Sequence, residues 1–357
     1  MVNSTKWYEN IVVTPCDNSE VEITGAFPLL AVAHYHAKAL AKLGNNIKVP
    51  GFRKGHVPSA IVVQRIGEQA IVHEAAEIAL SENYPSIVAE QRLAVVGQPQ
   101  IVLTKLAAGN PIEFKITTAV MPEVFLPDYK MLAEDVFKEK TDESIDVSDT
   151  DVDNVILQLR ENKWRIDHKD ADTKKKPDES ELPELTLALI KTLGDFVSLD
   201  DFRAKIKESI VFDKKRKAQE KRRAAIGEKL IEETKVSLPR IFVESELEKM
   251  LAQFRHDVAA LGMPFDEYLK KLNKTENDLR NEWKRDAEKR ATLQLAFNAL
   301  AEKENITVAE EEIKKQTEHI LTHHKEAKEE NVRVYVTTLL KNERVFRFLE
   351  DHGHEPD

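Results

Sequence analysis

The most informative stretch of the sequence is Val49-Pro50-Gly51-Phe52-Arg53-Lys54-Gly55-His56-Val57-Pro58. A proline near each end restricts the backbone, and two glycines permit tight turns on either side of Phe52, Arg53 and Lys54. The pattern predicts a short exposed loop that holds these three side chains outward. An aromatic ring can fill an apolar slot on a protein, an arginine can pair with a carboxylate or phosphate, and a lysine adds a point charge. The residues alone leave one alternative open, a basic surface turn with Phe52 folded back onto the domain.

The sequence on both sides of this stretch mixes strand and helix patterns. Short β-branched runs at 11–13 and 21–24, joined by a turn-rich segment, predict a hairpin. Helical spacing predicts one helix from about Pro28 to Gly44-Asn45, then two or three between Ala60 and Leu93, with breaks at Gly67 and near Tyr84-Pro85. Strands at 101–104 and 112–120 complete the unit. We therefore expect an α+β domain, a small antiparallel sheet with helices inserted in its middle.

The rest of the chain is predicted to be helical. Ser148 with Asp151 has the pattern of a helix N-cap, and the densely charged segment 165–181 has too few apolar residues to fold. After Leu182, apolar residues recur at three and four residues, which is typical of amphipathic helices packed into an all-α domain. The predicted helix starts in this domain are Pro183, Ser198, Pro239, Thr275 and Thr307, and the last helix carries Val332, Val336, Leu339, Phe346 and Leu349 on one stripe.

Charge distribution suggests where the domains divide. Charged residues are sparse up to residue 130 and become about twice as frequent beyond it. A chain of 357 residues usually forms more than one core. The predicted organisation is an α+β domain at 1–130, a linker with one helix and a charged segment at 131–182, and a helical domain at 183–357.

The central stretch resembles the ribosome-binding signature of trigger factors, Gly-Phe-Arg-x-Gly-x-x-Pro, and the order of elements around it is similar to the N-terminal domain of that family. Further segments similar to trigger factors follow in the same order, so the resemblance covers nearly the whole chain. These segments are Met121-Pro122-Glu123-Val124, Glu181-Leu182-Pro183-Glu184-Leu185 and Leu340-Lys341-Asn342-Glu343-Arg344-Val345-Phe346-Arg347-Phe348-Leu349.

The resemblance implies an ATP-independent chaperone that binds the ribosome at the exit tunnel and shields nascent polypeptides. Its ribosome partners would be a protein at the tunnel exit and nearby ribosomal RNA, and a homodimer off the ribosome is an open alternative. Many members carry a third cation where this chain has His56, so docking is expected to be weaker or mildly sensitive to pH. The residues expected to bind the ribosome are Gly51, Phe52, Arg53, Lys54, Gly55, His56 and Pro58.

Trigger factors also project helical arms whose inner faces leave apolar patches open to unfolded clients. In this chain the apolar helical stripes suit both a packed core and such patches, and the sequence does not separate the two. The candidate client-binding residues are Met250, Phe254, Trp283, Phe297, Ile320 and Phe346.

The chain departs most from the family at the prolyl isomerase domain. Trigger factors usually hold a domain of the FK506-binding type between the linker helix and the C-terminal helices, but here only Arg165 to Glu181 separates Trp164 from Leu182. This segment is too short to fold unaided and has no aromatic pocket. We therefore expect no isomerase activity, no catalytic residues and no enzyme. An alternative from another functional class is a ribosome-independent holdase or assembly chaperone. The chain could also be labelled a prolyl isomerase, but only because its family carries that label.

Several other functions are disfavoured by composition. A net charge of −10 argues against a protein that coats nucleic acid indiscriminately. The sequence has no apolar stretch long enough to span a membrane and no secretory signal pattern, so we expect a cytoplasmic protein without a membrane partner. The lone Cys16 cannot form an internal disulfide, and His319 and His323 are too few for a zinc site, so we expect neither metal nor cofactor. The cations between Lys214 and Arg223 suit the solvated face of a helix.

Overall fold

A computed structural model describes residues 6–47, 50, 52, 56–107, 109–139, 146–168 and 177–353. The chain forms two compact units, and each takes residues from two separate parts of the sequence. Unit 1 comprises Met1–Phe125 and Thr234–Ala299, and unit 2 comprises Leu126–Glu233 and Leu300–Asp357. The predicted domain limits, 1–130, 131–182 and 183–357, stay a prediction. They divide the chain by sequence, whereas the two compact units are defined by contacts in space.

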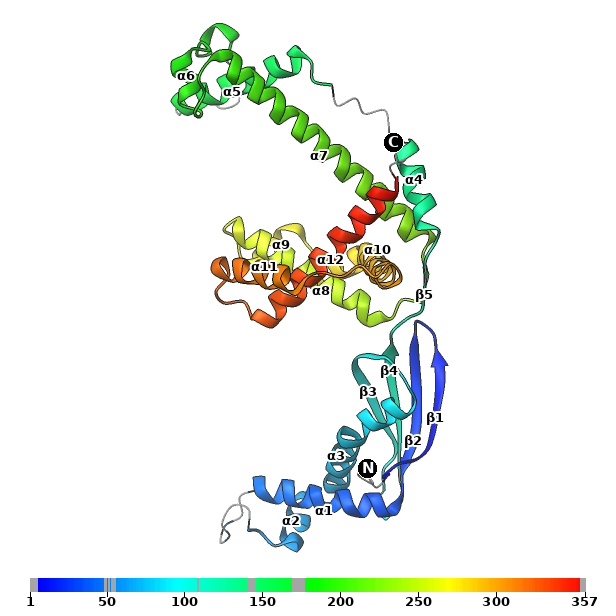
Figure 1. The fold of residues 1–357 in the computed structure, drawn as a ribbon. Helices are drawn as coiled ribbons and strands as arrows, with labels where there is room; N and C mark the ends of the chain where they lie inside the picture. The colour runs from blue at the N-terminus through cyan, green and yellow to red at the C-terminus, as the bar shows by residue number, and fades with distance from the viewer. Residues whose placement is uncertain are drawn as a thin grey trace. The chain divides into compact units, whose positions relative to one another are not determined.

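Unit 1 begins with a four-stranded antiparallel sheet in the order β1-β2-β4-β3 (Figure 1). The hairpin predicted from the sequence is confirmed, and strand 95–105 begins six residues earlier than predicted. In the central pair, Ile23 lies opposite Ile116 and Phe27 opposite Ile112. The strands are β1 (Glu9–Cys16), β2 (Glu20–Phe27), β3 (Val95–Lys105) and β4 (Ile112–Val120).

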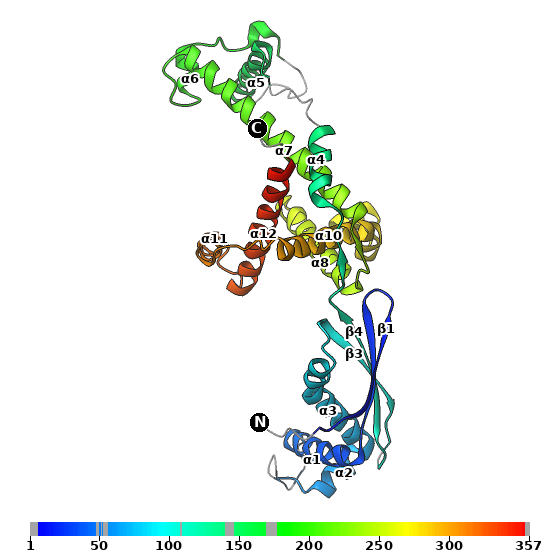
Figure 2. The ribbon, with the colours of Figure 1, turned by 45° about the vertical axis from the view of Figure 1, so that its right-hand side comes forward.

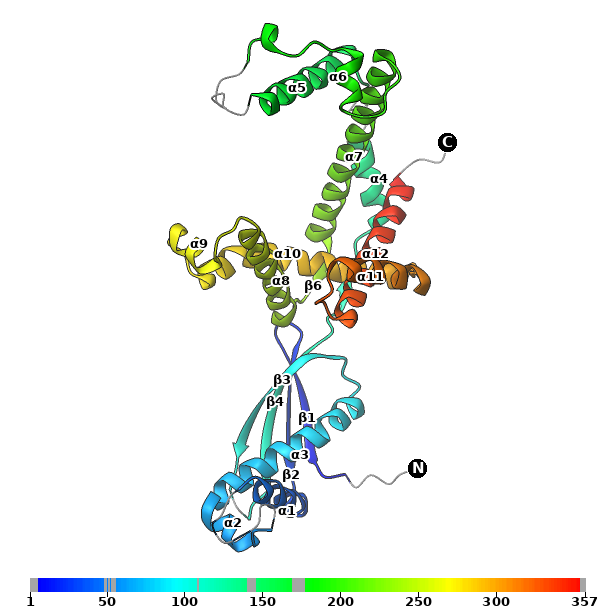
Figure 3. The same ribbon diagram turned by 90° about the vertical axis from the view of Figure 1, so that its left-hand side faces the viewer.

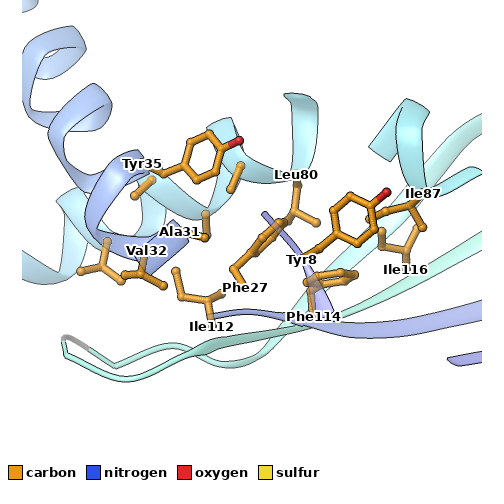
Figure 4. Close-up of a cluster of buried hydrophobic side chains, with 14 of the residues drawn as sticks. Tyr8, Phe27, Ala31, Val32, Tyr35, Leu80, Ile87, Ile112, Phe114 and Ile116 are labelled. Carbon is orange, nitrogen blue, oxygen red and sulfur yellow. The ribbon is translucent and has the colours of Figure 1, made fainter. Parts of the chain in front are cut away.

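Helices α1 (Leu29–Asn46), α2 (Ser59–Ile66) and α3 (Glu68–Glu90) are inserted between β2 and β3. Figure 3 views the sheet from the side that α3 covers. Alternate residues of β2 and β4 point toward the helices, because side chains along a strand alternate between its two faces. Figure 4 shows these strand residues meeting Tyr35 of α1 and Leu80 of α3 in one apolar core.

The break predicted near Tyr84-Pro85 is wrong, because α3 continues through Pro85 to Glu90. A proline inside a helix removes one backbone hydrogen bond and usually kinks or ends the helix. Here the residues on both sides of it are held in the core, since Leu80 and Ile87 are buried. This packing stabilises the helix on both sides of Pro85 despite the missing bond.

Unit 1 is completed by residues from the second half of the chain. Strand β5 (Val124–Phe125) pairs with β6 (Lys235–Val236). Three helices follow, α8 (Arg240–Ala260), α9 (Phe265–Leu272) and most of α10 (Glu276–Lys303). The predicted end of α8 is confirmed, because Gly262 takes the left-handed conformation with φ of 75°. The predicted start of α10 is confirmed as well, because the Asp278 carboxylate accepts the backbone N–H of Thr275 at 2.8 Å.

Unit 2 is built around the long helix α7 (Leu199–Glu233). Its first part packs against α5 (Asp149–Asp167) and α6 (Leu187–Lys191), and its later part packs against α4 (Tyr129–Glu139) (Figure 2). Helix α12 (Glu329–Gly353) packs against both α4 and α11 (Glu310–His323), and a short 3-10 helix spans Glu179–Glu181. The predicted fold class, an α+β N-terminal part followed by a helical C-terminal part, is confirmed.

Two predicted helix starts in this unit are wrong. Helix α6 begins at Leu187, because Thr186 Oγ1 accepts the backbone N–H of Leu189, whereas the carbonyl of Pro183 accepts a hydrogen bond from Arg160 Nε at 2.7 Å. Helix α11 has Ala309 as its N-cap. The prediction placed this cap at Thr307, whose carbonyl is instead occupied by Arg344.

Candidate functional site

The loop that carries the sequence signature joins the end of α1 to the start of α2. Of its predicted docking residues, Gly51, Arg53, Lys54 and Gly55 lie outside the described residues. The side chain of Phe52 is 42% exposed. An aromatic ring that remains this accessible has apolar surface available for a partner.

The C-terminal end of the loop is fixed by its junction with α2. Pro58 is the N-cap of this helix, and its carbonyl accepts the backbone N–H groups of Ile61 at 2.9 Å and Val62 at 3.1 Å. The preceding Val57 lines a cavity of about 280 Å³ between α1 and α2, whereas the neighbouring His56 is exposed. The loop therefore ends on an ordered helix start.

The N-terminal end of the loop leaves α1, which is held firmly against α3. Asn83 Nδ2 donates to Tyr35 Oη at 2.8 Å and to the carbonyl of Ala79 at 2.7 Å. Burial raises the pKa of the Tyr35 hydroxyl, which therefore stays neutral in the core. Lys38 also pairs with Glu82 at 2.7 Å between the same two helices. The helix from which the loop starts is thus bonded to α3.

The predicted client-binding residues of unit 1 lie among α8, α9 and α10. Met250 and Trp283 are partly buried against Val243 and Leu247. Phe254 packs edge-on against Trp283 with ring centroids 5.3 Å apart. These side chains hold helices together and still keep part of their surface accessible.

The remaining three candidates differ in accessibility. Phe297 is only 2% exposed, so a client reaches it only if the helices around it separate. Ile320 is partly buried against a cluster that contains Ile313 and Val336. Phe346 is partly buried beneath the guanidinium of Arg223, which lies 5.2 Å from its ring centroid.

Other apolar side chains are more exposed than these candidates, and the helical periodicity singled out Leu339 alone among those named below. Periodicity marks the residues that face a core, whereas a client surface consists of apolar residues outside that stripe. Leu339, which the stripe of the last helix included, is itself exposed. Among the residues of unit 2 that the structure describes, the most exposed large apolar ones are Met131, Ile166, Val197, Phe212, Val334, Tyr335 and Leu339.

The described residues contain no group of three or more metal-ligating side chains. His319 and His323 lie edge to face with ring centroids 5.3 Å apart. Cys16 ends β1 and is exposed. None of the helices in the described ranges has the length and apolarity needed to cross a bilayer.

Two family models match the chain and together span most of it. The model described as bacterial trigger factor protein matches residues 10–159, and the model of its C-terminus matches residues 198–349. The chain belongs to the bacterial trigger factor family. This trigger factor is therefore a ribosome-associated chaperone of nascent polypeptides.

Curated relatives agree over most of their length. A trigger factor of Shouchella clausii is 27% identical, covering 78% of this chain and 81% of the relative. One of Halalkalibacterium halodurans is 25% identical, covering 88% of this chain and 92% of the relative. A solved structure entitled "Promiscuous Substrate Recognition in Folding and Assembly Activities of the Trigger Factor Chaperone" matches the fold with a TM-score of 0.58 at 15% identity, covering 97% of this chain and all of the other.

The alignments also show that the relatives carry extra residues. The alignment with the Halalkalibacterium halodurans protein runs over 408 positions, which exceeds the 357 residues of this chain. Some residues of that relative therefore have no counterpart here. The stretch between the two matched regions of this trigger factor runs only from residue 160 to 197.

Proposed function

We propose that this trigger factor docks at the ribosomal exit tunnel through the loop 51–58, with Phe52, Arg53 and Lys54 as the principal contacts. The observation that carries the proposal is the exposed ring of Phe52 within the signature sequence, on a loop whose two ends are fixed by ordered helices. The ring would fill an apolar slot on a tunnel-exit protein. The two cations would then contact carboxylates or phosphates of that protein and of nearby ribosomal RNA.

Ribosome pelleting tests this proposal. In the triple variant F52A/R53A/K54A, ribosome affinity should fall by roughly 30-fold or more, because the loss of a buried aromatic and a paired arginine costs on the order of 2 kcal/mol. A matched control removes the same kinds of side chain from exposed positions of α7, in the variant F212A/K215A/R216A. With ribosomes that carry no nascent chain, this control should pellet like the wild type.

Equal co-sedimentation of the wild type and the loop variant would disprove docking through the loop. If neither pelleted with ribosomes while both suppressed aggregation equally, the protein would be a ribosome-independent holdase or assembly chaperone. These two results are distinguishable, because the first keeps ribosome binding and the second loses it in every form of the protein.

Nascent chains would be held by the exposed apolar residues of unit 2 together with the accessible parts of Met250, Phe254, Trp283, Ile320 and Phe346. Each contact would be weak and reversible. Weak contacts suit a chaperone that must release its client, since tight binding of the unfolded state would oppose folding. Binding of this kind needs no ATP or other cofactor.

We further propose that this trigger factor is not a prolyl isomerase. The relatives' alignments exceed the length of this chain, and residues 165–181 are too few to form a domain. In a protease-coupled assay with a proline peptide, cis-to-trans conversion should proceed at the uncatalysed rate, tens of seconds at 25 °C. Catalysed turnover would show that another part of the chain supplies an isomerase site.

The protein would act in the cytoplasm, where ribosomes release nascent chains. A homodimer off the ribosome stays a prediction. Sedimentation of the free protein over a range of concentrations would test it, because a dimer dissociates on dilution.

A further inference from the structure

Strand β3 forms one edge of the sheet, so one side of its backbone has no neighbouring strand among the described residues. Its residues Gln100 to Leu103 keep a regular register with β4, with Ile101 opposite Ile116 and Val102 opposite Lys115. The register shifts on both sides of this segment. About four residues therefore present a straight free edge to a further strand.

An apolar groove of about 760 Å³ lies between this edge and α3. Its lining includes Ile101, which is 43% exposed, together with Leu80 and Leu103. Tyr84 also lines the groove and is fixed to the sheet, because its hydroxyl donates to Thr118 Oγ1 at 3.2 Å. The groove is thus continuous with the free edge of the sheet.

Polar groups of the groove come from α3. Glu77 is the acidic residue among those that line it, and its carboxylate lies 3.4 Å from His73 Nδ1. Ser81 and Pro85 line the groove as well. Because a proline has no backbone N–H, Pro85 cannot give the Ser81 carbonyl its usual helical hydrogen bond. The helix side of the groove therefore offers a carboxylate.

We propose that this groove is a client-binding site that takes an extended, largely apolar polypeptide segment with a lysine or arginine beside it, by addition of a strand to β3. A free strand edge pairs only with an extended backbone, and the neighbouring groove accepts every second side chain of the added strand. Glu77 favours a cationic flanking residue over an acidic one. This proposal rests on the chaperone function and adds a site for a defined class of client segment.

The short edge explains why such a site would not cause aggregation. Long, flat strand edges recruit other chains, and proteins limit them with bulges and prolines. Here Pro99 and the register shifts confine pairing to a few residues. A client would gain only a few backbone hydrogen bonds and would be released readily.

Fluorescence anisotropy of the full chain with a labelled peptide tests the proposal. The probe has about ten residues, with valine and threonine alternating and a lysine at each end, and is extended when bound. Substitution I101D should weaken binding about tenfold, because Ile101 lies opposite the core residue Ile116 and therefore faces the groove, where the aspartate places a charge. The matched control is V12D on β1, the other edge of the sheet, where Val12 is 56% exposed. Its affinity should equal that of the wild type.

A second probe leaves the protein unchanged. The same peptide N-methylated at alternate residues loses the N–H donors along one edge, and it should bind about tenfold more weakly. Equal binding of the methylated peptide would refute strand addition, and equal binding by I101D would refute the groove. If I101D lowered self-association of the chain and left peptide binding unchanged, the groove would hold a second copy and the proposal would fall.

The outcome is independent of docking by the loop. The peptide assay contains no ribosomes, and I101D should still pellet with ribosomes like the wild type. Failure of peptide binding with intact pelleting would remove this site alone. Failure of pelleting with intact peptide binding would remove the docking proposal alone.

Discussion

Replacement of Phe114 by alanine is expected to lower the free energy of unfolding of the N-terminal sheet by about 3 to 5 kcal/mol. Phe114 is 1% exposed and lies at the centre of the core between the sheet and its helices. Its ring centroid is 4.9 Å from that of Phe27. The substitution removes these contacts and leaves a cavity that the surrounding strands can fill only in part.

Hydrogen exchange followed by mass spectrometry in increasing urea would measure this change, since peptides from β2 and β4 report on opening of the sheet. The matched control is F125A, because Phe125 is exposed and its loss should cost less than about 1 kcal/mol. If F114A behaved like this control, the core assigned to unit 1 would be wrong.

Replacement of Arg223 by alanine should destabilise the contact between α7 and α12 by about 2 to 4 kcal/mol. The guanidinium makes paired hydrogen bonds with two carboxylates of α12. Nε lies 2.8 Å from Glu350 Oε1, and Nη1 lies 2.7 Å from Glu343 Oε2. The substitution leaves two partly buried carboxylates side by side without their cation, which adds repulsion to the lost bonds.

The same contact should weaken in acid. Hydrogen bonds from Arg223 hold the pKa of Glu343 below its ordinary value of 4.5. A carboxylate whose pKa is lowered by folding contributes stability above its unfolded pKa. That contribution is lost as the pH falls through the lower pKa of the folded state. Stability at this contact should therefore be constant near neutrality and decrease below about pH 4.5.

Exchange of the backbone amides in α7 and α12 at pH 7 and at pH 4 would check both expectations. Arg216 provides a control on the same helix, because it is exposed and its ion pairs contribute little. R216A should leave exchange in α12 unchanged. The assignment of Arg223 would fail if R223A and R216A exchanged alike, or if R223A kept the acid sensitivity of the wild type.

Sequence patterns predicted elements well where the signal is local. Ser148 with Asp151 and Ser198 with Asp201 form helix caps as expected, because each hydrogen bond closes within four residues. The incorrect starts at Pro183 and Thr307 share another cause. In both cases an arginine from a distant position, Arg160 or Arg344, occupies the carbonyl, and no local pattern contains that information.

The candidate site shows the same division. The glycines and prolines of the signature predicted a loop, and the order of apolar residues predicted the helices that carry it. Exposure of apolar residues such as Val197 and Tyr335 depends on which helix faces remain unpaired after packing. The groove beside β3 depends on strand order, which joins residues far apart in sequence. Hydrophobic periodicity alone therefore predicts neither the exposed apolar residues nor the groove.

The discontinuity of unit 1 affects how this chaperone is itself made. Its first strands and helices are translated early, but α8, α9 and most of α10 belong to the same unit and are translated only after all of 126–233. The sheet and its three helices have their own core and can form at once, whereas the complete unit must wait until residue 299 has left the tunnel. A newly made molecule therefore passes through a stage in which unit 1 is only partly formed, while it is still attached to a ribosome, the particle with which the finished chaperone associates.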